Sequence, residues 1–181
     1  CAAVETAKAV SAERTVTLVQ ALTAMPQGVE AMDTDFPGLV QTSLNMGVVK
    51  LDGDGLHIAF SIRSSIASRK LMLAQRVRAV AALAGGTVAE RGVYPGWQYK
   101  RESQFRDTLL AAYKDLTGKD GVVEATHGGL ECGLLIEKIP GLDAVSMGPE
   151  LHDVHSVRER LSVPSTERTY ELVCELLRRS C

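Results

Sequence analysis

Hydrophobic residues recur at helical spacing in some stretches of the chain and alternate with polar residues in others. Residues 12–25 carry apolar side chains at helical spacing and are followed by a Pro-Gln-Gly stop, a pattern that predicts an amphipathic helix. Residues 43–51 and 56–63 are two strand-like segments joined by Asp52-Gly53-Asp54-Gly55. These four turn residues accept positive φ, so the two segments predict a hairpin.

The second strand of this hairpin alternates between its two sides. Ile58, Phe60 and Ile62 point one way, whereas His57 and Arg63 are among the residues that point the other way. We therefore expect Arg63 on the polar face of a sheet.

A second long helix is predicted after the hairpin. Its apolar residues recur from Leu73 to Ala84, and Gly85-Gly86 supplies a C-terminal stop. Residues 87–94 then have the character of a strand. Residues 1–97 thus follow the order helix, strand, strand, helix, strand, which predicts helices on one face of an antiparallel sheet, as in a ferredoxin-like sandwich. Many unrelated functions use this layout, so it supports no activity by itself.

A domain boundary is predicted near Pro95-Gly96-Trp97, where the hydrophobic periodicity pauses. Ser103 is placed to cap a helix that ends at Gly118. Beyond it we expect a strand at residues 122–123, a helix through Ile136, a strand at residues 144–146 and a final helix over residues 165–179. The whole chain therefore predicts an α/β (α+β) fold. Two short strands are too few for a stable sheet, so residues 98–181 look like the tail of a larger domain.

Composition excludes several classes of function. The chain has 181 residues, 45% hydrophobic and 23% charged, with a formal net charge of -2, which is the balance of a soluble globular protein. Its basic residues are scattered, so no nucleic-acid surface is expected. No apolar run approaches the roughly 20 residues that span a bilayer, and no secretory signal is recognisable at the start. The four cysteines form no C-x-x-C pair, so we expect free thiols and a cytoplasmic protein.

A glycine-rich segment at residues 127–133 lies where a predicted strand enters a predicted helix. Glycines allow close approach of the backbone, and free amides at a helix N-terminus attract an anion such as a peptide carboxylate. Considered alone, however, the pattern favours a tight strand-to-helix turn that needs no ligand.

Two histidines, His152 and His155, lie three residues apart beyond the strand predicted at residues 144–146. Imidazole nitrogens next to acidic residues could bind zinc. A zinc site needs three or four ligands, and this segment offers at most the two histidines and Asp153. Spacing alone therefore favours surface histidines in a loop.

The chain carries five short motifs, at residues 42–49, 62–65, 94–97, 127–133 and 148–156. In order and spacing they resemble the aminoacyl-histidine dipeptidases, a branch of the two-zinc exopeptidases related to carboxypeptidases and aminoacylases. Each motif would be weak alone, but five in order make a chance resemblance a poor explanation. The resemblance implies that the chain is the C-terminal portion of a metallopeptidase that hydrolyses Xaa-His dipeptides.

The resemblance also implies how the two parts of the chain divide the work. In that family an α/β catalytic domain holds two zinc ions, and an inserted ferredoxin-like lid domain closes over the dipeptide and often mediates dimerisation. Residues 1–97 would then be most of the lid domain, and residues 98–181 the end of the catalytic domain. We therefore expect a homo-oligomer, a dipeptide substrate and zinc as the cofactor of the complete protein.

One residue matches a metal ligand of the family. His155 corresponds to the last ligand, the His of a motif usually written H-S/T-P-D-E. Here Val157 and Arg158 replace the Pro and the Asp of that motif, whereas Glu159 keeps the acid. The resemblance therefore implies that His155 binds zinc, in a loop whose shape differs from the family pattern.

Two residues match substrate-binding positions of the family. Arg63 corresponds to the family's arginine that resembles an anchor for the substrate. The planar guanidinium group is well shaped to bind a carboxylate. An exposed surface charge is the alternative interpretation of Arg63. Gly129 matches a position that lines the substrate pocket, where a missing side chain would let a peptide lie close. The resemblance assigns no role to His127, Glu131 or His152.

The chain lacks most of the catalytic residues that the family uses. Two metals about 3.5–4 Å apart would activate a bridging water, and a neighbouring glutamate would move its proton. In the family, that glutamate and the other ligands lie upstream, in an H-x-D segment and a paired acidic segment. None of the four histidines here is followed two residues later by Asp, and the sequence has no Glu-Glu pair. We therefore predict no catalytic residue, and no dipeptidase activity, in this chain alone.

A non-catalytic dimerisation or binding module is the alternative function, because a lid-like sandwich can pair through a sheet edge or its helices. The pattern of helices and strands does not separate the two functions. The second part of the chain favours the peptidase, since a dimerisation module would not need a glycine turn or a loop that presents His155.

Overall fold

The computed structural model describes residues 9–53, 55–127 and 129–180. Two cysteines of the sequence, Cys1 and Cys181, lie outside the described residues, as do Asp54 of the predicted turn and Gly128 of the glycine-rich segment. The chain forms two compact units. Unit 1 comprises Cys1–Gly96 and Thr126–Gly129, and unit 2 comprises Trp97–Ala125 and Leu130–Cys181.

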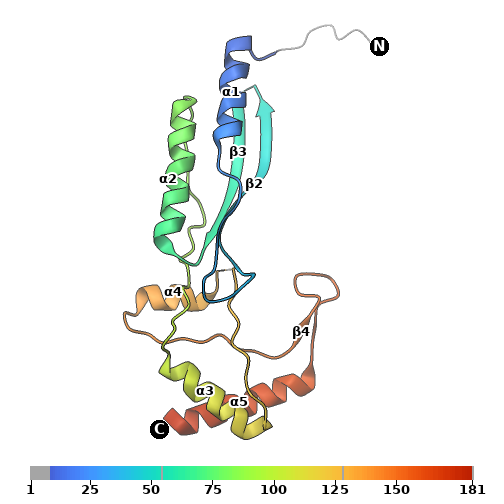
Figure 1. The fold of residues 1–181 in the computed structure, drawn as a ribbon. Helices are drawn as coiled ribbons and strands as arrows, with labels where there is room; N and C mark the ends of the chain where they lie inside the picture. The colour runs from blue at the N-terminus through green and yellow to red at the C-terminus, as the bar shows by residue number, and fades with distance from the viewer. Residues whose placement is uncertain (1–8, 54, 128, 181) are drawn as a thin grey trace. The chain divides into compact units, whose positions relative to one another are not determined.

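Unit 1 is built from a three-stranded antiparallel sheet and two helices (Figure 1). The strands follow the order β1-β2-β3 in the sheet. In chain order the elements are α1 (Ala12–Ala24), β1 (Gly28–Met32), β2 (Val40–Asp52), β3 (Gly55–Ser64) and α2 (Ala67–Leu83).

Both helices of unit 1 end where the sequence indicates, whereas α2 begins at Ala67, ahead of the apolar repeat that predicted it. Ser11 caps α1, since its side chain accepts a hydrogen bond from the Arg14 amide. The guanidinium of Arg14 in turn donates to the carbonyl of Ala84, the residue that caps α2, over 2.9 Å. The two predicted helices of the first part are therefore confirmed, and a side-chain hydrogen bond connects the start of one to the end of the other.

One face of the sheet forms the core of unit 1. Leu44 on β2 and Leu73 and Val77 on α2 are buried together. The register pairs Leu44 with Ile62 across the two strands, and Ile62, Phe60 and Met25 pack around the cluster. Since side chains alternate along a strand, the odd-numbered neighbours of Leu44 and Ile62 point to the opposite face. The predicted hairpin and its apolar side are thus confirmed.

Unit 1 departs from the sequence prediction at two strands. β1 was not anticipated, because Gly28–Met32 mixes glycine, glutamate and apolar residues without a clear alternation. Residues 87–94 were predicted to form a strand, but the structure has no strand there. A segment with strand-like composition forms a strand only when a neighbouring strand supplies hydrogen bonds. Here β1, and not residues 87–94, pairs with β2.

Unit 2 contains three helices and a short hairpin. Helices α3 and α5 pack against each other, and the cleft between them is apolar, with Phe105, Val145 and Leu176 among its lining residues. The elements are α3 (Gln104–Thr117), α4 (Glu131–Lys138), β4 (Leu151–His152), β5 (Arg160–Leu161) and α5 (Val163–Ser180). The three helices predicted for this part are confirmed.

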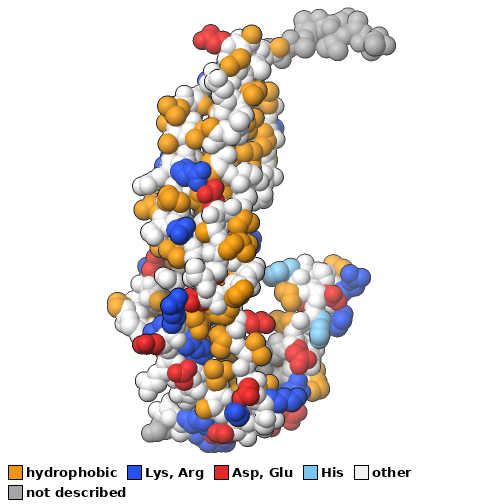
Figure 2. Space-filling view, in the orientation of Figure 1, with side chains coloured by type: hydrophobic (Ala, Val, Ile, Leu, Met, Phe, Trp, Pro, Cys, Tyr) orange, Lys and Arg blue, Asp and Glu red, His pale blue; other side chains and the backbone are white. Residues whose placement is uncertain are grey.

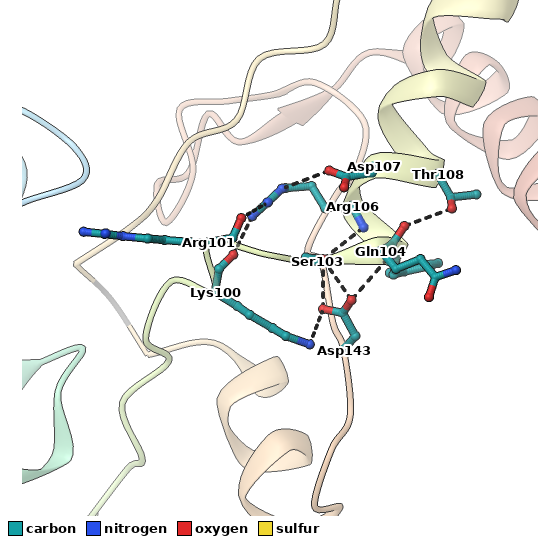
Figure 3. Close-up of polar contacts among 9 residues, drawn as sticks. Lys100, Arg101, Ser103, Gln104, Arg106, Asp107, Thr108 and Asp143 are labelled. Atoms are coloured by element: carbon teal, nitrogen blue, oxygen red, sulfur yellow. Dashed lines mark hydrogen bonds and ion pairs between the residues drawn. The ribbon is translucent and has the colours of Figure 1, made fainter.

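The start of α3 is held by a carboxylate from a distant loop (Figure 3). The Ser103 hydroxyl donates to the Asp143 carboxylate over 2.9 Å and accepts from the Arg106 amide, and the Phe105 amide donates to Asp143 over 3.2 Å. Burial opposes ionisation of Asp143, but these hydrogen bonds and the Lys100 ammonium outweigh it and lower the pKa of the carboxyl. A negative charge at a helix N-terminus also suits the helix dipole. Asp143 thus fixes its own loop to the first turn of α3.

The strands predicted at residues 122–123 and 144–146 are absent from unit 2. Within the described part of the chain, no strand pairs with either segment, and the short β4–β5 hairpin is a separate sheet. These segments therefore run as loops without regular secondary structure.

The predicted fold class is confirmed, since the structure mixes helices with antiparallel strands. Among the helices that the structure describes, none combines the length and apolar character needed to cross a bilayer.

Candidate functional site

The polar face of the unit 1 sheet carries the predicted substrate arginine. Arg63 on β3 stands directly opposite Ser43 on β2 in the antiparallel register, so their side chains leave the same face. Arg63 is exposed, whereas Ser43 is half-buried. Asn45 and Ser61 form the next pair on this face. The face opposite the core therefore carries hydrogen-bonding side chains beside the exposed guanidinium of Arg63.

The glycine-rich segment contacts this face through His127, its first residue. The imidazole Nε2 of His127 lies 2.8 Å from the hydroxyl oxygen of Ser43, although 84 positions separate the two residues. Either atom can donate this hydrogen bond, depending on the tautomer of the ring. The other ring nitrogen, Nδ1, is buried and forms no hydrogen bond within the described residues. His127 therefore connects the segment Thr126–Gly129 to strand β2.

The surroundings of His127 favour the neutral imidazole. Burial lowers the pKa of His127, and the positive charge of Arg63 lowers it further. The Val40 backbone raises this pKa, but by less than the two other effects lower it. The positive charge of Arg63 thus disfavours protonation of the imidazole that is hydrogen-bonded to Ser43. Arg63, Ser43 and His127 are connected by the strand register and by the Ser43–His127 hydrogen bond, and we call them the Arg63 cluster.

Gly129, the second predicted substrate residue, lies two positions after His127 and packs against the ring of Tyr94. The carbonyl of Tyr94 accepts a hydrogen bond from the Lys70 ammonium on α2. A β-carbon on Gly96 would meet the carbonyl oxygens of Ser64 and Ser65. Residues 94–96 are therefore packed tightly between the end of β3 and the segment Thr126–Gly129, all within unit 1.

His155 lies in unit 2, in the turn between β4 and β5. Its backbone has a positive φ of 64°, and its amide donates to the Glu159 carboxylate over 2.8 Å. Asp153 in the same turn also has positive φ, at 51°, and pairs with Arg160. His155 is exposed. Figure 2 shows His side chains, in pale blue, on the visible surface of the protein. The departures from the family motif thus occur in a closed turn that Glu159 stabilises.

The residues that the structure describes do not form a site for a zinc pair. The described residues contain no group of three or more His, Cys, Asp or Glu side chains placed to hold a metal ion. A catalytic zinc takes three protein ligands, and a pair of ions takes more, so His155 alone cannot hold them. Any zinc chemistry would need ligands from outside the described part of the chain.

Two other residues of the motifs acquire a structural setting but no chemical role. Glu131 is the first residue of α4, where a negative charge suits the helix dipole. His152 lies opposite Arg160 in the backbone register of the β4–β5 hairpin. Sequence reasoning missed Ser43 and Tyr94 as neighbours of the site. Both belong to the matched motifs, but their contacts with the glycine-rich segment depend on tertiary packing.

Comparison with known proteins defines a class: the chain is similar to part of the dipeptidases. It is 35% identical over 162 residues to the cytosol non-specific dipeptidase of Escherichia coli strain K12, which corresponds to 90% of this chain and 33% of that protein. No protein-family model matches.

Solved structures give the same result. The aminoacylhistidine dipeptidase of Vibrio alginolyticus superimposes with a TM-score of 0.83 and 30% identity, over 96% of this chain and 36% of that one. Aminopeptidase PepT of Bacillus cereus superimposes with a TM-score of 0.66 over 90% of this chain and 44% of that one, at 18% identity, and shares the fold.

The resemblance to aminoacyl-histidine dipeptidases inferred from five motifs is therefore confirmed. The chain spans about a third of the length of the dipeptidases it matches.

Proposed function

We propose that this chain is a segment of a zinc-dependent dipeptidase, in which unit 1 binds the carboxylate end of a dipeptide and unit 2 supplies one metal ligand. One observation carries the proposal. Ser43, which stands opposite Arg63 on the polar face of the sheet, is hydrogen-bonded to His127 of the glycine-rich segment. Two motifs far apart in sequence thus contribute to one surface.

Arg63 is the anchor for the substrate carboxylate. Its guanidinium is exposed on a face of polar side chains, and no ion pair with a carboxylate is found for it within the described residues. A guanidinium without a partner can accept a carboxylate in bidentate geometry. We propose that Gly129, which is exposed and follows His127 by two positions, adds backbone to this site.

His155 is the metal ligand, and it acts only together with residues that this chain does not supply. The exposed imidazole stands in a turn closed by the Glu159 carboxylate, so the ring is presented to solvent rather than used in packing. Because a zinc pair needs several more ligands and a general base, the chain by itself is inactive.

The substrate class, location and assembly follow from the same proposal. The substrates are Xaa-His and related dipeptides, and the protein acts in the cytoplasm, as the name of the Escherichia coli relative suggests for that protein. Self-association is supported by large apolar side chains that stay exposed on one half of strand β2: Val48, Val49 and Leu51.

Calorimetric titration of the purified chain with glycyl-glycine tests the carboxylate site. Arg63→Gln should weaken binding about tenfold or more, because a charge-assisted hydrogen bond is lost. Arg69→Gln, at an exposed arginine near the start of α2, is the matched control and should bind like the unchanged chain. Equal affinity in both variants would contradict the proposed role of Arg63.

A hydrolysis assay separates the peptidase segment from a complete enzyme. The purified chain, supplied with zinc, should not hydrolyse β-alanyl-histidine. Measurable turnover would show that the chain contains a complete site and would overturn the proposal of inactivity. The alternative is a dimerisation module without a substrate site. It predicts that the chain self-associates and that Arg63→Gln does not change the binding of glycyl-glycine.

A further inference from the structure

We infer that His127 is a positioning residue of the carboxylate site, and that its protonation is linked to occupation of Arg63 by the substrate carboxylate. This inference rests on the proposed function, since it requires a carboxylate at Arg63. It assigns a role to a histidine for which the motifs alone suggest none.

The positioning role follows from the contacts of the ring. His127 is half-buried, and its Nε2 atom lies within hydrogen-bond distance of Ser43, the residue directly opposite Arg63. The ring therefore holds the segment Thr126–Gly129 to β2 at the residue directly opposite Arg63. Loss of this hydrogen bond would free the segment from β2 without removing any group that contacts the substrate.

The linkage follows from the charges around the ring. Arg63 on β3 is the charged group that acts on His127, Ser43 on β2 shares its hydrogen bond, and the backbone of Val40 favours the protonated ring. In the empty site a protonated His127 would face an uncompensated guanidinium. A carboxylate on Arg63 neutralises that charge and makes protonation of the ring easier.

Thermodynamic reciprocity then fixes the direction of the pH effect. If a bound carboxylate raises the pKa of His127, protonation of His127 must strengthen carboxylate binding by the same factor. We expect a gain in affinity of about threefold as the pH falls through the titration of the ring.

The test is an NMR titration of the histidine ring protons in the purified chain, with and without saturating glycyl-glycine. The pKa of His127 should rise with glycyl-glycine and should not rise with glycyl-glycinamide, which has the same length without the carboxylate. His57, which is exposed and pairs with Asp52 over 3.2 Å, is the internal control and should be indifferent to both.

Two variants separate linkage from a purely structural role. In Arg63→Gln the pKa of His127 should be higher in the free chain and should no longer respond to glycyl-glycine. His127→Gln can keep a hydrogen bond to Ser43 but cannot titrate, so it should bind glycyl-glycine with an affinity that is flat across the range in which the unchanged chain gains threefold.

The outcomes distinguish this inference from the proposed function. Binding of glycyl-glycine without a change in the His127 pKa overturns the linkage and leaves the carboxylate site standing. A pH-dependent affinity that persists in His127→Gln also overturns it. Absence of binding overturns both. The titration of the unchanged chain decides the matter even if a variant does not fold.

Discussion

Gly129 lies so close to Tyr94 that a β-carbon added to it would be 2.3 Å from Cδ1 and 2.7 Å from Cε1 of the ring. Real β-carbons do not approach other atoms this closely, so one of the two residues would have to move. The resemblance suggests that a missing side chain at position 129 makes room for a peptide. In the structure the space on the β-carbon side is already filled by the tyrosine ring.

Gly129→Ala should therefore destabilise unit 1 by about 1–3 kcal/mol, the usual cost of forcing an extra carbon into a packed site. Gly47→Ala is the matched control, since its β-carbon would meet nothing closer than 3.5 Å. Urea denaturation measures both. If the clash with the ring is the cause, combining Gly129→Ala with Tyr94→Ala should remove most of the additional cost, and strict additivity would exclude that cause.

Leu73→Ala should cost about 2–5 kcal/mol of the free energy of unfolding, because it opens a cavity at a fully buried position between α2 and the sheet. Leu71 lies on the same helix but is 54% exposed, so Leu71→Ala should cost about 0.5 kcal/mol or less. Denaturant midpoints compare the two. Similar losses for both leucines would mean that α2 does not bury the face described above.

Asp143→Asn should weaken unit 2 at neutral pH and flatten its loss of stability in acid. The pKa of Asp143 is lowered in the folded chain, so its contribution is present above the usual carboxyl pKa, near 3.9, and is lost as the pH falls through the lower folded value. Asp120→Asn, at a highly exposed carboxylate, is the control. Melting temperatures between pH 2 and 7 give the comparison, and an unchanged acid limb in Asp143→Asn would contradict the prediction.

Unit 1 should lose stability as the pH falls below about 6.5, the usual pKa of histidine. Burial and then Arg63 lower the folded pKa of His127, so the unfolded chain binds the proton more readily, and stability is lost as the pH falls through the folded value. His127→Gln should reduce this dependence, whereas His57→Gln should preserve it. Denaturation at pH 7 and pH 5 tests the expectation, which fails if the two variants behave alike.

Local signals predicted the helices well. Ser103 and Gly118 identify the two ends of α3 from sequence, and in the structure the serine caps the first turn while the glycine takes a left-handed φ of 70°. Such capping needs only neighbours along the chain, so a sequence contains the information.

Strands depend on partners that local sequence does not specify. Residues 87–94 and 144–146 have strand-like composition, yet neither pairs with another strand within the described residues. The mixed composition of β1 hides a strand that pairs with β2. Hydrogen bonding to a neighbour decides the outcome for each of these segments.

The candidate site was predictable in its parts and not in its arrangement. Alternation along the second hairpin strand assigns Arg63 to the polar face, and the register agrees. The hydrogen bond between Ser43 and His127 joins residues 84 positions apart, so no local pattern could reveal it. The role of His155 as a metal ligand stays a prediction.

The segment Thr126–Gly129 makes unit 1 discontinuous along the chain. A gene fragment ending at Gly96 would encode the helices and strands described for unit 1 and would still lack His127, the hydrogen-bonding partner of Ser43. The unit therefore cannot be moved between proteins as a single cassette. A chimaera that borrows its polar face must borrow two stretches of sequence, and a split of the chain near Gly96 would turn the second stretch into a peptide donated by the other half.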